Sequence, residues 1–267
     1  MTYTTPMPLS QNGCVDAISE HSAGFAAAVR AAPDGLATDL EWLPGWDLST
    51  LVQHLIQVHL TWMTIVRDRL WDRPDEAQRP VFTDSDDLVA RFEAGATRLT
   101  QVLAAADPRD RVWTWAPTRQ DAGFVIRHQV QEIVVHHWDA AHAAGLFLTV
   151  DPLVGADSVD EFLHFSVSSA DDHEDPPPPA LDGTFELRCT DSSYAWRLTD
   201  GDLPGTVRVE RLDPATADDP DTCLPVVSAT GGDLLLWLYG RIPLDTAAVD
   251  AVDPDLIERF RALTDTA

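Results

Sequence analysis

The spacing of the apolar residues changes along this chain, and that change does most to limit its fold. In residues 48–65 apolar side chains recur every three or four positions, which predicts an α-helix with one buried face. Within residues 183–212 they alternate with polar side chains between turns rich in Asp, Ser and Gly, which predicts a small antiparallel sheet. The expected fold class is therefore α+β, with a helical part followed by a smaller mixed part.

The helical part contains four long segments, which indicates an antiparallel four-helix bundle. The first spans residues 15–32, and the second begins near Asp47 or Ser49, both of which are plausible caps. The third and fourth span residues 85–106 and about 123–144, where Gly145 ends the pattern.

An acidic and proline-rich segment then divides the chain into two expected domains. Residues 171–180 contain four consecutive prolines after an acidic run, a composition typical of a linker. We therefore expect a helical domain over residues 1–170 and a small α+β domain over residues 181–267. In the second domain, residues 225–242 predict a strand, a Gly-Gly turn and a short apolar helix.

The charge of the chain excludes several classes of function. It carries 44 acidic residues against 18 basic ones, and every basic residue is an arginine. The absence of lysine excludes pyridoxal phosphate enzymes, Schiff-base aldolases and P-loop chemistry that depend on a lysine of the chain. The net charge of −26 disfavours nucleic acid and anionic membranes as partners, and it keeps the protein soluble.

The cysteines and the N-terminus indicate an intracellular protein without a disulfide framework. Cys14, Cys189 and Cys223 are odd in number and widely spaced, which supports neither a disulfide scaffold nor a structural zinc knuckle. No run approaches the roughly 18 apolar residues of a membrane span. The N-terminus lacks the basic and apolar stretches of a signal peptide, so we expect a cytoplasmic protein.

The segment QVQEIVVHHWDAAHAAG, residues 129–145, carries the strongest candidate for a functional site. Glu132 and His136 are four positions apart in a predicted helix, so their side chains rise from one face about 6 Å apart. A third metal ligand can come from another helix of a bundle, and His54 is best placed, at the border of an apolar face. Two histidines and one carboxylate leave coordination positions open, which is typical of a catalytic metal site.

The alternative interpretation of these residues is ordinary packing. Glu and His at this spacing occur by chance, and His59, His137 and His142 face elsewhere by helical geometry. His128 and Asp139 are candidates for support behind the ligands, since a carboxylate commonly orients a ligating imidazole. Four tryptophans either line a pocket near the metal or are buried in the bundle: Trp42, Trp46, Trp62 and Trp138.

Three segments together resemble the mycothiol-dependent maleylpyruvate isomerase family, part of the DinB-like superfamily of metal-binding bundles. In the fourth helix the matching residues are Arg127, Glu132, His136, Trp138, Asp139, Ala140 and Gly145. In the segment WDLSTLVQHLIQVH they are Trp46, Asp47, Leu51 and His54. The segment GGDLLLWLYGR, which ends at Arg241, resembles a C-terminal stretch of the family, so the similarity spans most of the chain.

This resemblance implies a cofactor, ligands and a reaction. It implies a divalent metal, zinc by preference, held by His54, Glu132 and His136, and a C-terminal domain related to sterol-carrier folds. It also implies that mycothiol is the thiol cofactor and that Arg241 faces the active site. The thiolate would add to the double bond of maleylpyruvate, the resulting single bond would rotate, and elimination would release fumarylpyruvate and the thiol.

Departures from the family pattern leave other activities open. Gln131 and His137 stand where the family often has histidine and arginine, and the acidic insert 171–180 is unusual. The same centre supports thiol S-transfer when the thiol stays attached, or hydrolysis when water replaces the thiol. A non-catalytic carrier of a small apolar ligand is the hypothesis from another class. The partners expected are a small-molecule substrate and a low-molecular-weight thiol, while the sequence leaves the oligomeric state open.

Overall fold

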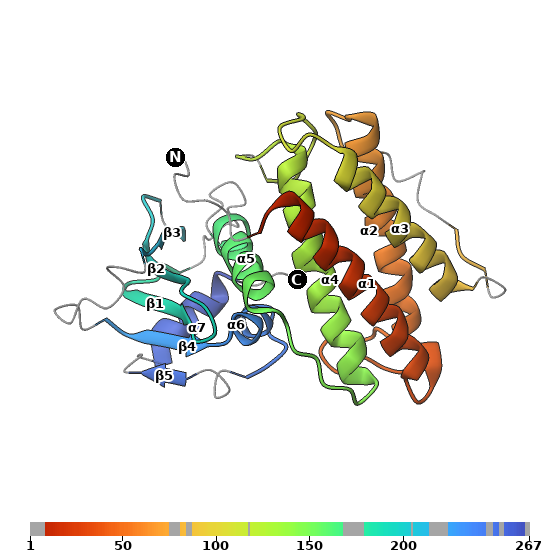
Figure 1. The fold of residues 1–267 in the computed structure, drawn as a ribbon. Coiled ribbons are helices and arrows are strands. Elements are labelled where there is room, and N and C mark those ends of the chain that lie inside the picture. Colours follow the sequence, from red (N-terminus) through yellow and green to blue (C-terminus); the bar gives the residue numbers. More distant parts are fainter. Residues whose placement is uncertain are drawn as a thin grey trace. The chain divides into compact units, whose positions relative to one another are not determined.

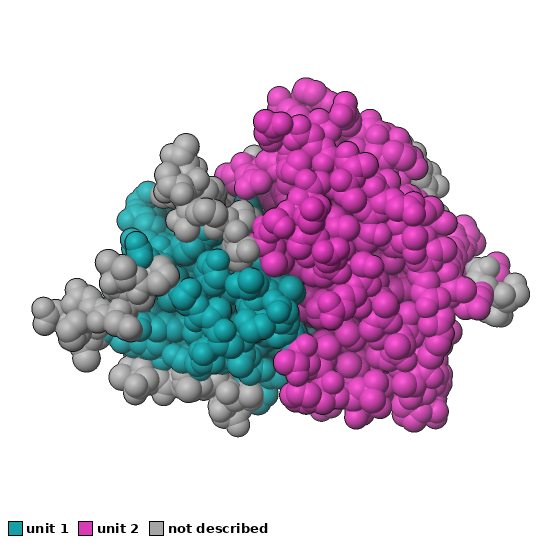
Figure 2. Space-filling view, viewed as in Figure 1, with its two compact units in different colours: residues 1–8, 150–267 teal, residues 9–149 magenta. Residues whose placement is uncertain are grey.

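Two compact units make up the described part of the chain in this computed structural model (Figure 2). One unit spans residues 9–149, and the other runs from residue 150 onward. The first is helical and the second combines a sheet with helices, which confirms the predicted α+β class. The structure describes residues 9–74, 81–83, 87–116, 118–167, 179–203, 205–213, 224–243, 248–250 and 254–264.

The first unit is a bundle of four helices: α1 (Gln11–Ala31), α2 (Leu48–Asp68), α3 (Leu88–Ala105) and α4 (Ala122–Ala143) (Figure 1). α1 packs against α4 and α3, and α2 packs against α3, whereas the contact between α2 and α4 is smaller. The predicted apolar stripe of α2 is buried, with Leu48, Leu51 and Leu55 fully inside.

Each helix of the bundle begins at a residue whose side chain caps its first turn. Side-chain oxygens of Ser10, Asp47, Asp87 and Asp121 accept hydrogen bonds from backbone N–H groups that lack a partner in the helix. Asp47 is thus the cap of the second helix, which confirms one of the two predicted candidates. Because Ser10 caps α1, that helix begins four residues before its predicted start at residue 15.

The second unit contains a mixed sheet. Its described strands are β1 (Thr184–Cys189), β2 (Ala195–Asp200), β3 (Val207–Arg211), β4 (Val226–Ala229) and β5 (Ala248–Asp250). They are ordered β3-β2-β1-β4-β5. β1, β2 and β3 pair antiparallel, as the alternation predicted, but β4 pairs parallel with β1, so the sheet is not wholly antiparallel.

The helices of this unit are α5 (Pro152–Phe162), which continues into the π-helical segment η3 (Leu163–Val167), α6 (Gly231–Leu238) and α7 (Pro254–Ala262). Gly155 meets Gly231 and Gly232 so closely that an added Cβ would collide with their backbone. The prediction of a Gly-Gly turn is wrong, because these glycines form the first turn of α6 after its cap at Thr230. No described helix in either unit is long and apolar enough to cross a membrane.

The division between the units falls at residue 150, inside the range 1–170 that the sequence assigned to the first domain. α5 groups with the sheet because it packs on α6 and because Asp160 binds Trp196 of β2 and Arg211 of β3. Most of the predicted linker, residues 171–180, lies outside the described residues.

Candidate metal centre

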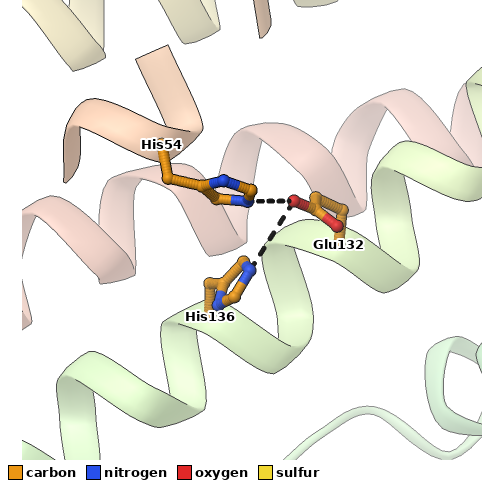
Figure 3. A group of neighbouring side chains, drawn as sticks. All are labelled: His54, Glu132 and His136. Atoms are coloured by element: carbon orange, nitrogen blue, oxygen red, sulfur yellow. Dashed lines mark hydrogen bonds and ion pairs between the residues drawn. The ribbon is translucent and has the colours of Figure 1, made fainter. Parts of the chain in front are cut away.

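Three metal-ligating side chains converge between α2 and α4 (Figure 3). His54 comes from α2, and Glu132 and His136 come from consecutive turns of α4. One ligand atom from each residue, an imidazole nitrogen or a carboxylate oxygen, lies within 4.8 Å of the other two. The structure therefore brings together the three residues that the spacing proposed as one group.

The carboxylate of Glu132 lies between the two imidazoles. Its Oε1 is 2.9 Å from Nε2 of His54 and 3.6 Å from Nε2 of His136. The two imidazole rings are edge to face, with their centres 5.3 Å apart. His54 keeps 34% of its side chain exposed against 12% for His136, so the group is more open on the α2 side.

Asp139 supports His136 from the next turn of α4. Its Oδ2 lies 2.9 Å from Nδ1 of His136, and its side chain is 1% exposed. Because this carboxylate engages Nδ1, Nε2 is left to face Glu132. Such a buried carboxylate fixes the orientation of a ligating imidazole and increases its basicity.

Electrostatics keep Glu132 ionised and His136 protonated in the metal-free centre. Burial opposes ionisation of Glu132, but the imidazoles of His136 and His54 beside it hold the pKa of this carboxyl well below its usual range. Burial also opposes protonation of His136, yet Asp139 and Glu132 raise the pKa of its imidazole to about 9. The carboxylates of Glu132 and Asp139 therefore favour a positive charge between them. A proton on His136 can supply that charge, and so can a metal ion.

The donor set fits a divalent metal ion with open coordination positions. Two imidazole nitrogens and one carboxylate oxygen form a set that zinc and neighbouring transition metals accept in catalytic sites. The spread of the three donor atoms, 4.8 Å at most, is compatible with a single ion among them. The support of His136 by Asp139 is the arrangement expected behind a ligating histidine.

The loop before α2 sets an aromatic ring against His54. After the 3-10 helix η1 (Gly35–Ala37), an isolated bridge between Asp39 and Asp47 closes this loop. Trp46 then stands edge-on to the His54 imidazole, with 5.4 Å between the ring centres. This contact limits the rotation of the His54 ring.

His137, the neighbour of His136, belongs to a different contact. Its Nδ1 lies 3.0 Å from Nδ1 of His21 in α1, and its ring occupies the space beside Gly24 where a larger residue would collide. The contacts of His21 and Gly24 with His137 were not predicted from the sequence. The available signal was that His21 follows Ile18 on the buried face of α1 at helical spacing.

The other histidines of α2 and α4 pack against aromatic rings. His59 contacts Phe92 of α3, and burial lowers the pKa of His59 to about 4, so it stays neutral. His142 stacks on Trp138, with ring centres 4.7 Å apart. The ring contacts of His128 include a stacked one with Phe124, so its predicted support of the metal ligands stays a prediction.

Arg241, the candidate from the second unit, follows α6 and is 8% exposed. Its Nη1 donates a hydrogen bond to the Tyr239 carbonyl oxygen at 3.0 Å, and the guanidinium lies over the Tyr239 ring. This contact orients the guanidinium within its own unit. The catalytic role assigned to Arg241 by resemblance stays a prediction.

The described cysteines are not exposed thiols. Cys14 and Cys189 are buried and form no disulfide among the described residues, and Cys223 lies outside the described residues. Burial raises the pKa of Cys189 to about 11, so this thiol is protonated at neutral pH. A thiolate reaction in the described part of the chain would therefore depend on a thiol from outside.

Known crystal structures have a fold similar to that of this chain. Two crystal structures are similar to the chain, each covering 93% of it and 97% of their own length. One is a mycothiol-dependent maleylpyruvate isomerase, with 12% identity and a TM-score of 0.62. The other is a mutant of the mycothiol-dependent maleylpyruvate isomerase in which a histidine is replaced by alanine, with 11% identity and a TM-score of 0.58.

A family comparison identifies the first unit more directly. Residues 15–141 match the family described as the mycothiol maleylpyruvate isomerase N-terminal domain, and this range contains all three residues of the candidate centre. No curated protein matches the chain. The match assigns residues 15–141, and with them the first unit, to this N-terminal domain family.

Proposed function

We propose that this protein is a metal-dependent, mycothiol-using enzyme that isomerises a small unsaturated carboxylic acid of the maleylpyruvate type. The observation that carries the proposal is the convergence of His54, Glu132 and His136 within 4.8 Å. A carrier of small ligands has no need for three such donors in one place. Membership of residues 15–141 in the family supports mycothiol as the thiol.

In this proposal three residues of the centre bind the metal ion and two others orient them. His54, Glu132 and His136 would hold the metal ion, zinc by preference. When bound, the metal supplies a thiolate near neutral pH, since a coordinated cation lowers the pKa of a thiol. Asp139 keeps Nε2 of His136 directed at the ion, and Trp46 limits the rotation of His54.

We assign Arg241 the task of binding a substrate carboxylate. A guanidinium holds a carboxylate through two parallel hydrogen bonds, and in a chain without lysine only arginines offer a permanent cation. Arg241→Gln is expected to raise KM for the acid about tenfold or more, while the metal content stays that of wild type. An unchanged KM would contradict this assignment.

Metal content tests the centre directly. Wild type is expected to hold about one equivalent of zinc after zinc is supplied and excess removed, and His54→Ala and His136→Ala to hold none. His142→Ala is the matched control, because this exposed histidine of α4 lies outside the three-residue group. If the wild-type protein binds no zinc, iron or nickel, the metal proposal is overturned, and a non-catalytic carrier of a small ligand becomes the favoured function.

The products then distinguish the activities of a metal-loaded protein. With mycothiol and maleylpyruvate we expect fumarylpyruvate and recovered thiol, and no turnover with His136→Ala. A stable thiol adduct would identify an S-transferase instead, and turnover without any thiol would identify a hydrolase.

A further inference from the structure

A group of aromatic side chains lies next to the candidate centre, at the same contact between α2 and α4. His128 precedes Glu132 by four positions on α4, so their Cβ atoms are about 5–6 Å apart on one face of the helix. Trp62 comes about two turns after His54 on α2, and its ring lies 5.9 Å from the His128 ring, measured between ring centres. Trp62 and His128 therefore join the two helices beside the place where His54 and Glu132 join them.

The connection between α3 and α4 adds two more tryptophans to this group (Figure 1). Trp113 stacks on Trp62 at an interplanar angle of 21°. Trp115 stands edge-on to His128, with ring centres 5.4 Å apart, and edge-on to Phe124 at 5.2 Å. We call these five residues, Trp62, Trp113, Trp115, Phe124 and His128, the aromatic cluster.

Hydrogen bonds fix the loop that carries Trp113 and Trp115. The backbone N–H of Trp113 donates to the Leu70 carbonyl oxygen, just after α2, at 2.7 Å. The side-chain amide of Gln120 donates to the Thr114 carbonyl oxygen at 2.8 Å and accepts from the Thr114 N–H at 3.2 Å. The two indoles are therefore held in place by the protein itself and need no ligand to order them.

Trp115 is the exposed member of the aromatic cluster. It is 40% exposed, whereas Trp62 and Phe124 are buried. An indole held in this way leaves apolar surface in water, and a flat ligand that covers it gains the free energy of burial. Because Trp115 contacts His128, one turn from Glu132, a ligand that extends from the centre by more than about 5 Å is expected to meet the cluster.

The residue types of the aromatic cluster favour an uncharged aromatic ring as the ligand. Aromatic rings attract one another in offset-stacked or edge-to-face arrangements, as the members of the cluster already do. An indole face also attracts cations. The cluster contains no carboxylate to hold a cation, however, and the only charge that a member can carry is a positive one on His128.

We propose that Trp115, with His128 beside it, selects substrates in which the unsaturated acid carries an aromatic ring. The naming of the substrate rests on the proposed function: the double bond would lie at the metal centre and the ring on the aromatic cluster. The substrate class is a cis 4-oxo-2-enoic acid with an aryl group on the oxo carbon. Trp115 is then a specificity-determining residue, which contacts the ring and takes no part in the bond changes.

Two acids test this selection on the zinc-loaded protein with mycothiol. Maleylpyruvate and cis-3-benzoylacrylate share the cis 4-oxo-2-enoate group, but the second carries a phenyl ring on the oxo carbon. We expect wild type to have the higher kcat/KM for the benzoyl acid, after the uncatalysed reaction with the thiol is subtracted. Trp115→Ala should lower this preference about tenfold through KM, whereas Trp115→Phe, which keeps a ring, should retain most of it.

Further measurements separate substrate selection from a structural role. Trp115→Ala should keep the zinc content and the KM for mycothiol of wild type. Trp71→Ala is the matched control and should leave both kcat/KM values unchanged, because Trp71 is 65% exposed on the same unit and lies outside the aromatic cluster. A wild type that prefers maleylpyruvate, an unchanged preference in Trp115→Ala, or a raised KM for mycothiol would overturn the selection and leave the proposed function intact.

If wild type isomerises neither acid, the proposed function fails, and binding then tests the aromatic cluster alone. The probe is 3-benzoylpropanoate, which is saturated and does not react with thiols, and its control is 4-oxopentanoate, which has a methyl group in place of the ring. Calorimetric titration measures both. Tighter binding of the benzoyl acid to wild type, lost in Trp115→Ala, would support the selection, and equal binding of the two acids or no binding would overturn it.

Discussion

Two buried carboxylates, Glu132 in the bundle and Asp160 in the second unit, differ in their closest charged partners, although the His164 imidazole also lies 3.5 Å from Asp160 Oδ1. Glu132 faces imidazoles, with Nε2 of His54 at 2.9 Å. Asp160 receives hydrogen bonds from two guanidinium nitrogens of Arg211, at 2.9 and 2.6 Å, and from Trp196 Nε1 at 2.8 Å. Both clusters bury charge, but they neutralise it differently.

The kind of partner decides what each cluster can do. A guanidinium stays protonated at every pH a protein experiences, so it never offers a lone pair. The pair of Asp160 and Arg211 therefore cannot exchange its proton for a metal ion. An imidazole releases its proton and then offers a lone pair. The group around Glu132 can therefore exchange a proton for a metal ion, whereas the pair of Asp160 and Arg211 can only stabilise the fold.

The largest change in stability is expected when the buried ion pair of Asp160 and Arg211 is broken. Asp160→Ala removes the bidentate partner of Arg211, which is itself largely buried, and should lower the free energy of unfolding by about 3–5 kcal/mol. Asp202→Ala is the control, because its bond to Arg208 is exposed and worth less than about 1 kcal/mol. Urea unfolding of the two variants measures the difference, and equal losses would contradict the distinction between buried and exposed pairs.

Zinc should stabilise the bundle only while its three donors are intact. At a free zinc concentration about a hundredfold above Kd, the free energy of unfolding should rise by about 3 kcal/mol in wild type. His54→Ala should show none of this gain, whereas Asp202→Ala should keep it in full. Thermal unfolding with and without zinc measures both, and a gain in His54→Ala would mean that zinc binds elsewhere.

Asp139 connects the two kinds of cluster, since it is a buried carboxylate that holds an imidazole. Asp139→Asn keeps the volume but removes the charge behind His136, and it should weaken zinc binding about 10- to 100-fold. Glu20→Gln, an exposed change on α1, is the control and should leave the affinity unchanged. Competition with a zinc chelator measures the affinities, and wild-type affinity in Asp139→Asn would reduce Asp139 to a packing residue.

The sequence predicted the open cluster because its geometry is mostly local. Glu132 and His136 lie on one helix, so their spacing alone sets them side by side. The position of His54 on the border of an apolar stripe then indicated the facing helix. The cap of α2 was predictable for the same reason, since Asp47 bonds to a backbone N–H only three residues away.

The closed cluster could not be predicted because its contacts are distant in sequence. Trp196 and Arg211 lie 36 and 51 residues beyond Asp160, and no spacing rule relates them. The same limit explains the parallel pairing of β4 with β1 and the packing of α5 with the second unit, both of which depend on tertiary contacts. The ring contacts of Trp42 with Trp138 and His142 likewise join a loop to a helix about a hundred residues later in the chain.

The pH dependence of zinc binding tests whether a proton and zinc compete for the group around Glu132. Zinc requires the neutral imidazole of His136, whose pKa is raised to about 9 in the metal-free protein. Zinc affinity should therefore rise about tenfold per pH unit between pH 7 and about 9, or about 1.4 kcal/mol per unit. Above that range the gain should end, because His136 is already neutral.

The stability of the metal-free protein should follow the opposite sign. Because folding raises the pKa of His136 above its ordinary value of 6.5, its contribution is complete below that pH and is lost as the pH rises through about 9. Asp139→Asn should shift the loss to lower pH, since Asp139 is one of the two groups that raise this pKa. If the zinc affinity stays constant from pH 7 to 9, zinc does not compete with a proton on His136, and the proposed exchange at the centre is contradicted.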